Sequence, residues 1–388
     1  MAVRYRWMIC DLLTDDYIVD LPLRVDSYDV RFNQPGVMSA RMPITNQRIN
    51  KLLNRAFPAD FEDLSAGPGR VVLHCIRQRT NLPDDLWASY WIWRAKTSQG
   101  RKGPPQIELA GMSLDGYFAQ VEIDALFERT ATDRIVIAHD LVTELQAQPY
   151  AGIGVAMQAG TCGITQDLIV KPTDKARYGD TLQKLADQSN GFEYRVDTRF
   201  DGTDRVRELV WGFPIISETD TRHDFSQPGN VLEWGIEADA LRGGTRYRAR
   251  GDSVTSDITN ESLPQLSEYV EASAHLAAGW PRLDRTVDLP GQTDLTALQG
   301  YATWWAETAP GPVRVHSVTV RLGDNPTLTP HRLGDYARIR LVNQRYPRID
   351  GVASFVRSWR VIGMEIRPPQ RSNGIETAEL LFEEQVSS

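Results

Sequence analysis

Two pairs of acidic residues have a spacing that could support hydrolysis of a glycosidic bond. Glu122 and Asp124 alternate along a predicted strand and so share one of its faces, while Asp84 and Asp85 are adjacent in a predicted turn. A glycosidase places two carboxyl groups across the bond that it cleaves. The chain contains 51 Asp and Glu residues, so pairs of this kind arise by chance. A solvated face is therefore the favoured interpretation of both pairs.

Pairs of tryptophans are the second feature that could recognise a sugar. Trp91 and Trp93 share a strand face, and Trp304 and Trp305 lie near the end of a predicted helix. Aromatic rows stack on sugar rings, but they also pack in cores and anchor subunit interfaces. We favour core or interface packing. A carbohydrate-binding or cell-wall-degrading protein is kept as the alternative function.

Other catalytic and cofactor-binding motifs are absent from the sequence. Residues 111–116, Gly-Met-Ser-Leu-Asp-Gly, come nearest to a nucleophile elbow, but their spacing is wrong and a strand is predicted after them. Gly152, Gly154 and Gly160 lack the spacing of a dinucleotide fingerprint. A phosphate-binding lysine loop, a His-Glu-x-x-His motif and an EF-hand loop are also missing. We therefore predict no catalytic residue, no cofactor and no enzymatic activity.

The histidines and cysteines do not indicate a metal site. The six histidines are scattered, and none forms a short-range pair of ligands. His74 lies in the apolar run 71–76, which predicts a satisfied core or surface side chain. Cys10, Cys75 and Cys162 are far apart in the sequence, so they indicate neither a disulfide framework nor a zinc knuckle. We expect them to be small buried hydrophobic residues.

The composition is that of a globular protein. A length of 388 residues predicts two or three domains, and the 41% hydrophobic content supplies a core, which excludes general disorder. No apolar run approaches the roughly 18 residues of a membrane-spanning helix, and the first residues lack the pattern of a secretion signal. The net charge of −8 argues against a protein that binds nucleic acid by neutralising phosphates.

Short strands dominate the first third of the chain. Turn-forming residues such as 33–36, Asn-Gln-Pro-Gly, separate apolar and alternating runs. Asn46 can cap a helix whose apolar residues recur until Pro58 stops it. The strands are expected at residues 4–13, 17–24, 27–32, 37–44, 70–77, 89–95 and 106–112.

The middle of the chain mixes helices with a hairpin. A turn at Asp115-Gly116 is expected to join two strand-like pieces, and a helix is expected over 140–148. Asp180 is predicted to cap a helix that ends at Gly191 in the left-handed conformation. A hairpin completes this region, with strands at 192–200 and 205–213 and a turn at Asp201-Gly202.

The last third begins with helices and ends with strands. Residues 262–265, Ser-Leu-Pro-Gln, match a capping box and predict a helix that extends to Ala277. A second helix is expected to contain Leu295, Leu298, Ala302 and Trp305 and to end near residues 310–312, Pro-Gly-Pro. Strands are then expected at 313–322, 336–341, 354–365 and 376–383. The fold class is therefore mainly β with α decorations (α+β), which suits barrel or sandwich domains with added helices.

Three segments share a pattern of spaced elements with one protein family. They are residues 107–117, residues 178–197 (a helix, a glycine and a strand), and a C-terminal arrangement of an expected helix near 267–277, residues 333–339 and a closing strand through 376–382. Together with the first strands, they resemble the tail-hub or minor tail proteins of long-tailed (siphovirus) bacteriophages, and the related baseplate hubs of contractile tails and VgrG-type spikes. The structural motif that the resemblance marks consists of Gly111, Gly116, Gly179, Asp180, Gly191, Phe192, Glu193, Gly334 and Asp335.

The resemblance implies a structural role. Such hubs are homotrimers in which each chain contributes two tube-type β-barrels, so that three chains form a pseudo-sixfold ring. The implied partners are the distal tail protein, the tail tube protein, the tape measure protein and a central fibre or spike. DNA would pass through the lumen without specific binding. The implied location is the virion tail tip, after synthesis in the host cytoplasm, with no membrane segment.

The resemblance also suggests how the chain is divided, and the domains are expected to be discontinuous. The chain ends shortly after the hub-like part, so we expect no peptidase, glycosidase or fibre domain beyond it. The expected domains are a first hub β-barrel at 1–125, an inserted α+β region at 126–250 with helix 180–190 and hairpin 192–213, a helical segment at 251–312, and C-terminal strands at 313–388 that complete the barrels.

Overall fold

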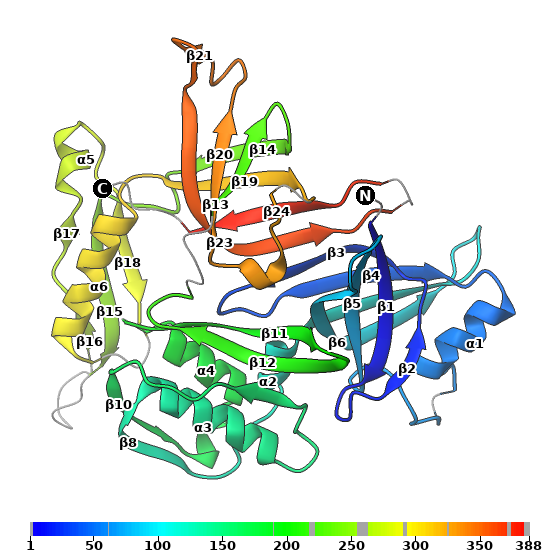
Figure 1. Cartoon of the computed structure of the whole chain (residues 1–388). Helices are drawn as coiled ribbons and strands as arrows, with labels where there is room; N and C mark the ends of the chain where they lie inside the picture. The colour runs from blue at the N-terminus through cyan, green and yellow to red at the C-terminus, as the bar shows by residue number, and fades with distance from the viewer. Residues whose placement is uncertain are drawn as a thin grey trace. The chain divides into compact units, whose positions relative to one another are not determined.

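The computed structural model describes residues 3–60, 62–188, 190–216, 222–253, 263–289, 293–323, 326–370 and 374–383. The chain forms two compact units. The first contains Met1–Glu233 and Val318–Phe382, and the second contains Trp234–Ser317 with the last residues of the chain. Of the residues, 47% lie in strands and 18% in helices, which confirms the mainly β fold (Figure 1). Among the described helices, none is both long and apolar enough to cross a membrane.

An antiparallel sheet forms the N-terminal part of the first unit, in the order β2-β1-β5-β6-β7-β4-β3. The strands expected here are present, but the boundary between the second and third strands, near Pro22, differs from the prediction. Because proline cannot donate a ladder hydrogen bond, β2 ends at Asp20 and β3 begins at Arg24, where the sequence predicted strands at 17–24 and 27–32. The bounds are β1 (Val3–Asp11), β2 (Tyr17–Asp20), β3 (Arg24–Arg31), β4 (Val37–Pro43), β5 (Val71–Arg79), β6 (Asp85–Ser98) and β7 (Gln106–Ser113).

Strand β23 connects this sheet to the other C-terminal strands. Its first half pairs with β20, and its second half pairs with β3 and β24. β20 also pairs in parallel with β13, a strand that the sequence did not predict. The bounds are β13 (Arg222–Gln227), β20 (Tyr336–Leu341), β21 (Arg348–Ile349), β22 (Val352–Ala353), β23 (Phe355–Arg367) and β24 (Thr377–Phe382), so the strands expected at 336–341, 354–365 and 376–383 are confirmed within a few residues.

The large sheet remains open among the described strands. Its hydrogen-bonded path does not return to its starting strand. The two closed barrels implied by the resemblance are therefore not seen within the described part of one chain.

Three helices and a hairpin complete the first unit. Helices α2, α3 and α4 lie on one side of the hairpin β11–β12 (Figure 1), and their apolar side chains share one core with β1 and β5. Met8 and Val72 from the strands and Leu141 and Leu182 from the helices are all buried in it. The bounds are α1 (Gln47–Ala56), α2 (Leu114–Phe118), β8 (Phe127–Asp133), α3 (Arg134–Ala147), β9 (Val155–Met157), β10 (Thr165–Val170), α4 (Tyr178–Ala186), β11 (Glu193–Asp201) and β12 (Asp204–Gly212).

Local capping explains which helix predictions were correct. Asn46 caps α1 as predicted, because its side chain accepts a hydrogen bond from the N–H of Ile49 at 3.0 Å. The helix expected over 140–148 begins earlier, at Arg134, where the Asp133 side chain accepts a hydrogen bond from the N–H of Ile135 at 2.9 Å. α3 is buried on several sides, so it lacks the polar face that would have marked its first turns in the sequence.

The glycine-containing turns needed correction. Asp115 and Gly116 lie in α2 and not in a turn between strands. α4 begins at Tyr178, so Asp180 lies in its first turn and does not cap it. A carboxylate at this position is stabilised by the helix dipole. The left-handed residue after α4 is Asn190, with φ of 54°, and not Gly191. Gly191 is needed for a different reason, since a Cβ there would collide with the carbonyl oxygen of Ala186.

The second unit contains a small sheet and two helices. β15 pairs antiparallel with β16 and β17 and parallel with β18, and α6 packs on β15. α6 confirms the helix predicted from Leu295 to near Pro310. The bounds are β15 (Arg246–Ser253), β16 (Pro264–Leu266), β17 (Val270–Glu271), α5 (Ser273–Ala277), β18 (Asp284–Asp288) and α6 (Leu295–Thr308), while β14 (Val231–Asp239) and β19 (Val313–Arg321) contain the two boundaries between the units.

The helix predicted up to Ala277 is wrong over most of its length. β16 and β17 occupy its first part, and the short α5 alone is helical. Ser267 Oγ accepts a hydrogen bond from the N–H of Ala249 at 2.8 Å, so pairing with β15 outweighs the local helical pattern. The expected cap, Ser262, lies outside the described residues. The described residues of the segment 251–312 therefore contain both strands and helices, where the sequence predicted a helical segment.

A buried ion pair joins β5 to the residue that precedes β24. The side chains of Arg77 and Glu376 are 3% and 1% exposed, and Arg77 Nη2 donates to Glu376 Oε2 at 2.6 Å. The Tyr5 hydroxyl also donates to Glu376, at 2.5 Å, and the Arg77 guanidinium lies 4.4 Å from the ring centre of Trp87. The pair holds together two segments that are 299 residues apart in the sequence.

Removing one partner of this pair should be costly. Arg77→Ala leaves the Glu376 carboxylate buried without its cation, so we expect the free energy of unfolding to fall by about 3–5 kcal/mol. The double variant Arg77→Met/Glu376→Leu should lose less, because no charge is left buried. Arg6→Ala, which breaks an exposed pair with Asp20, should cost less than about 1 kcal/mol. Urea denaturation measures all three, and equal losses for the two single variants would contradict the prediction.

Candidate functional site

The hairpin β11–β12 presents charged side chains on both of its faces. Its turn lies at Asp201-Gly202 as predicted, and the strands pair in one continuous register. Since side chains alternate along a strand, Arg205 and Arg207 lie on one face, and Glu193 and Asp197 lie on the other. Each of these charges meets a partner from a distant segment. We call the whole set the polar seam: Asp15, His74, Glu193, Asp197, Arg205, Arg207, His331 and Arg360.

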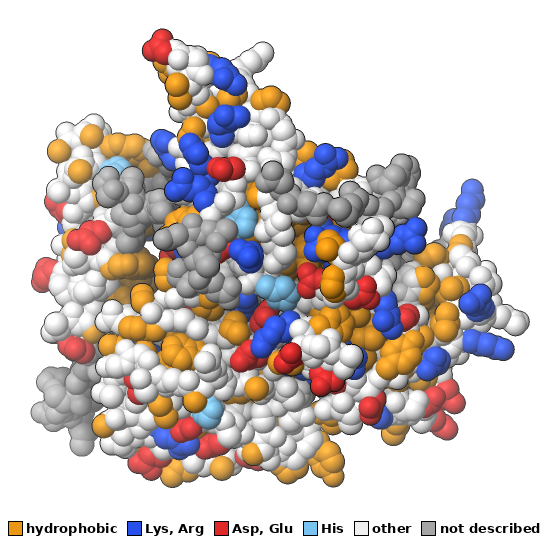
Figure 2. All heavy atoms as spheres, in the orientation of Figure 1, with side chains coloured by type: hydrophobic (Ala, Val, Ile, Leu, Met, Phe, Trp, Pro, Cys, Tyr) orange, Lys and Arg blue, Asp and Glu red, His pale blue; other side chains and the backbone are white. Residues whose placement is uncertain are grey.

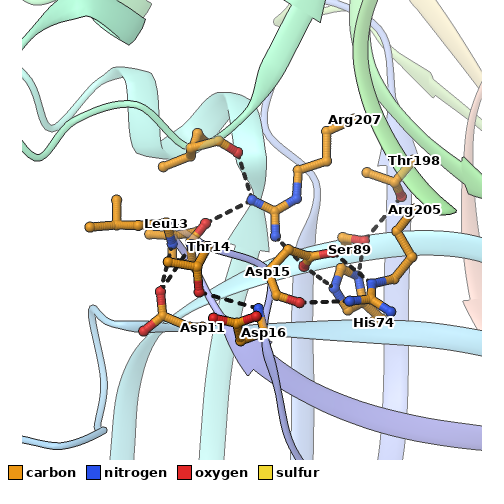
Figure 3. Close-up of polar contacts among 12 residues, drawn as sticks. Asp11, Leu13, Thr14, Asp15, Asp16, His74, Ser89, Thr198, Arg205 and Arg207 are labelled. Carbon is orange, nitrogen blue, oxygen red and sulfur yellow. Dashed lines mark hydrogen bonds and ion pairs between the residues drawn. The ribbon is translucent and has the colours of Figure 1, made fainter.

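On the first face, Asp15 is the centre of the polar contacts (Figure 3). It lies in the turn between β1 and β2 with φ of 60°, a left-handed conformation that aspartate tolerates. Its Oδ1 atom accepts from His74 Nε2 at 2.8 Å and from Arg207 Nη2 at 2.5 Å, and its Oδ2 atom accepts from Arg205 Nε at 2.6 Å. Arg207 also donates to the carbonyl oxygen of Leu12 at 2.7 Å. The network ties the N-terminal turn to the tip of the hairpin.

The protonation states follow from burial and from the neighbouring charges. Burial lowers the pKa of His74 below its ordinary value, and the arginines Arg207 and Arg205 add to the effect, so the imidazole is neutral. Its Nδ1 atom lies 2.6 Å from Ser89 Oγ, so both ring nitrogens are hydrogen-bonded. Burial raises the pKa of Asp15, but hydrogen bonds from His74 and the arginines outweigh it and hold the pKa well below the ordinary value. The carboxylate is therefore ionised.

Cys10, Asp15 and His74 have ligand atoms within 4.8 Å of one another, as a metal site would. The chemistry of the group does not suit a cation. Both oxygens of Asp15 already accept hydrogen bonds from Arg205 and Arg207, whose charges repel a metal ion. Burial raises the pKa of the Cys10 thiol to about 12, so this side chain does not offer a thiolate. The group acts as a buried ion-pair network.

The second face of the hairpin lines a cleft of about 800 Å³. His331, which lies in the short 3-10 turn Pro330–Arg332, reaches into it between two carboxylates. Its Nδ1 atom is 2.8 Å from Asp197 Oδ1, and its Nε2 atom is 3.6 Å from Asp85 Oδ1. Burial lowers the pKa of His331, but the hydrogen bonds and charges of the two carboxylates outweigh it and raise the pKa to about 9. The imidazole is therefore charged at neutral pH.

Arg360 is the cation of a second buried pair on this face. It is 1% exposed, and its Nη1 atom donates to Glu193 Oε1 at 2.7 Å. Its Nη2 atom donates to the carbonyl oxygen of Ile216 at 2.7 Å, and the N–H of Ile216 donates back to Glu193 at 2.8 Å. Gly334 has φ of 104° and lies so close to the Ile216 carbonyl that a Cβ would collide with it. The buried Asp335 follows, with one carboxylate oxygen 2.8 Å from His223 Nε2.

The structure thus divides the nine motif residues into two groups. Glu193, Gly334 and Asp335 come together near Arg360, as described above. The others lie around the helices. A Cβ on Gly179 would be 2.5 Å from the Ala119 nitrogen, and one on Gly116 would be 2.5 Å from Met112 Sδ. In the remainder of this group, Gly111 lies in β7, Asp180 is exposed, Gly191 follows α4 and Phe192 is buried. That these nine residues form a family motif stays a prediction.

The candidate sugar-binding residues do not form a common site. Glu122 and Asp124 are exposed and do not line the cleft. Asp85 and Asp197 do line it, but each has a lowered pKa despite burial, because the charged His331 lies 2.8 Å from Asp197 and 3.6 Å from Asp85. A glycosidase needs one carboxyl group whose pKa is raised, so that it can act as an acid. This pair is therefore unsuited to that role.

The tryptophans are divided between packing and surface. Trp91 is half-buried and donates to the Gly69 carbonyl oxygen at 2.8 Å. Trp93 and Trp304 are 44% and 56% exposed. These tryptophans do not line the cleft, so they supply no stacking platform for a sugar there.

Sequence reasoning missed the partners of the hairpin. Asp15, His331 and Arg360 were not singled out, although each anchors one of its contacts. The available signal was the alternation of charge within the hairpin itself, as in Glu193-x-Arg195-x-Asp197. Residues two apart share one face of a strand, and charges that are buried on one face need partners packed against that face.

The whole chain shares its fold with solved tail proteins. The tail protein from Neisseria meningitidis MC58 is 12% identical with a TM-score of 0.57, over 98% of this chain and 97% of that chain. The 43 kDa tail protein of prophage MuSo2 from Shewanella oneidensis is 10% identical with a TM-score of 0.57, over 97% and 98%. No family model and no curated protein matches the sequence. The resemblance to phage tail proteins is confirmed at the level of the fold.

The charged His331 should make the free energy of unfolding decrease as the pH rises into the alkaline range. Its pKa rises from 6.5 to about 9 on folding, so its contribution is complete below pH 6.5 and is lost as the pH rises through about 9. We expect a loss on the order of 2–3 kcal/mol over this range. The groups that face it are Asp85, Asp197 and Arg195. Urea denaturation of His331→Gln should lack this slope, whereas His139→Gln should keep it; an unchanged slope in His331→Gln would refute the assignment.

The close packing at Gly334 can be tested in the same way. Gly334→Ala places a Cβ against the Ile216 carbonyl in a left-handed conformation, so we expect a loss of about 1–3 kcal/mol in the free energy of unfolding. Gly300→Ala is the matched control, because Gly300 lies within α6 with open space around its Cβ position. That variant should be neutral or more stable by up to about 1 kcal/mol. Thermal and urea denaturation would measure both, and a neutral Gly334→Ala would contradict the packing argument.

Proposed function

We propose that this protein is a structural tail hub, which forms a homotrimeric, pseudo-sixfold ring at the tip of a phage tail. One observation supports the proposal above all others: the fold agrees with those of two solved tail proteins over nearly the whole length of this chain and of theirs. Because this similarity of fold covers 98% and 97% of the chain, it includes both compact units.

In this proposal the ring joins the tail tube and distal tail protein to the central fibre or spike, next to the tape measure protein. DNA passes through its lumen during ejection. The formal charge of −8 on each chain supports passage without binding, because acidic walls repel phosphates. The ring would also complete the barrels, since sheets that remain open within one chain can be continued by neighbouring chains.

The proposed role requires binding and no covalent chemistry. The polar seam supports this view, because its charged groups are engaged with one another. Asp85 and Asp197, the two carboxylates beside His331, have lowered pKa values, whereas a general acid needs a raised one. The geometry of the cleft therefore does not support the alternative of a wall-degrading protein.

The hub domains expected at 1–125, 126–250, 251–312 and 313–388 stay part of the hub proposal.

Electron cryomicroscopy of the assembled particle tests the proposal directly. We expect three copies of the chain around the tail axis at the tip, with acidic side chains toward the lumen. Native mass spectrometry of the purified full chain gives an independent reading, with a trimer as the expected species. A position away from the axis, or a copy number other than three, would overturn the hub assignment.

A further inference from the structure

The strands at one end of the first unit have a charge opposite to that of the whole chain. We call this region the arginine arm and define it as residues 222–227 and 336–358, which contain β13, β20, the hairpin β21–β22 and the start of β23. Its exposed cations are Arg222, Arg338, Arg340, Arg345, Arg348 and Arg357, against two exposed carboxylates, Asp224 and Asp350. Figure 2 shows basic side chains gathered over this region. The chain as a whole has a net charge of −8.

The pairing of the strands gives the arm one polar face. Arg338 and Arg340 are two residues apart on β20 and so project to the same side of the sheet. Ile339 between them is buried on the opposite side. The one carboxylate in register on this face is Asp224, which is 71% exposed and lies 3.9 Å from Arg338. A loose pair of this kind leaves the face basic.

Two apolar side chains are exposed beside the turn of the hairpin β21–β22, which consists of Asp350 and Gly351. Ile349 and Val352 lie opposite each other in the pair β21–β22, and they are 62% and 67% exposed. The hairpin projects beyond the ends of β20 and β23 (Figure 1). Moving two branched apolar side chains from water into an apolar recess lowers the free energy, so Ile349 and Val352 suit a contact of this kind.

We propose that the arginine arm docks on another protein, with its basic face against an acidic surface and the side chains of Ile349 and Val352 in an apolar recess next to that surface. The inference stands apart from the proposed place in the tail. The arm contains arginines and no lysine. Arginine binds carboxylates through two parallel hydrogen bonds and is enriched in protein interfaces, where lysine is depleted. A phosphate backbone would be bound by the same charges, but it would have no use for Ile349 and Val352.

Fluorescence anisotropy with the full chain distinguishes these cases. The probes are three labelled oligomers of equal length: a peptide of alternating Glu and Leu, an oligoglutamate and an oligothymidylate. We expect the Glu–Leu peptide to bind most tightly. Arg338→Glu/Arg340→Glu should weaken its binding by about tenfold or more, and Ile349→Ser/Val352→Ser should weaken it toward the affinity of oligoglutamate.

The matched control is Arg48→Glu/Arg55→Glu, which reverses two exposed arginines on α1 and changes the net charge by the same amount. It should bind the Glu–Leu peptide like the wild type. Thermal denaturation confirms that each variant is folded. If oligothymidylate bound most tightly and Ile349→Ser/Val352→Ser had no effect, the partner would be a nucleic acid and the protein-docking proposal would be wrong. Absence of binding, or equal losses in the control, would overturn the proposal.

Discussion

The first unit depends on the rule that buried charges must be paired. The hairpin β11–β12 has Arg205 and Arg207 on one face and Glu193, Arg195 and Asp197 on the other, and these five side chains are buried or half-buried. Asp15 meets Arg205 and Arg207, and Glu193 meets Arg360. Because an unpaired buried charge costs several kcal/mol, the turn after β1 and the middle of β23 must both reach the hairpin for the unit to fold.

These ion pairs give the fold its register more than its stability. Replacing a buried pair with apolar residues of similar size often leaves stability unchanged, whereas breaking one is severe. A shift of β23 by one residue would turn Arg360 away from Glu193 and bring its neighbours, Trp359 and Val361, to the polar side. The apolar core under α3 and α4 has no such selectivity, since its aliphatic side chains can repack. The polar seam therefore selects one arrangement among those that the core would accept.

The sequence predicted what depends on neighbours along the chain. The Asp201-Gly202 hairpin, α6 and β20 all have strong local patterns, and all three were predicted correctly. The helix expected up to Ala277 failed because pairing with β15 outweighs its helical spacing.

The polar seam was predictable only in part, for a similar reason. Glu193 was marked by the resemblance, but Arg360 is 167 residues away, and Asp15 is 190 residues from Arg205. Partners at such separations leave no trace in local periodicity. Charge alternation within the hairpin indicated that partners exist without saying where they are.

Buried and exposed arginines have different roles in this chain. Arg77, Arg207 and Arg360 have their charge neutralised internally, so they can contribute to a partner surface only if the fold opens. Arg338 and Arg340 have no such restriction. The solved tail protein at 12% identity shares with this chain an arrangement of elements. In the docking proposed above, Arg338 and Arg340 contact the partner, whereas the buried arginines hold the fold, so a change at the docking face would leave the buried pairs intact.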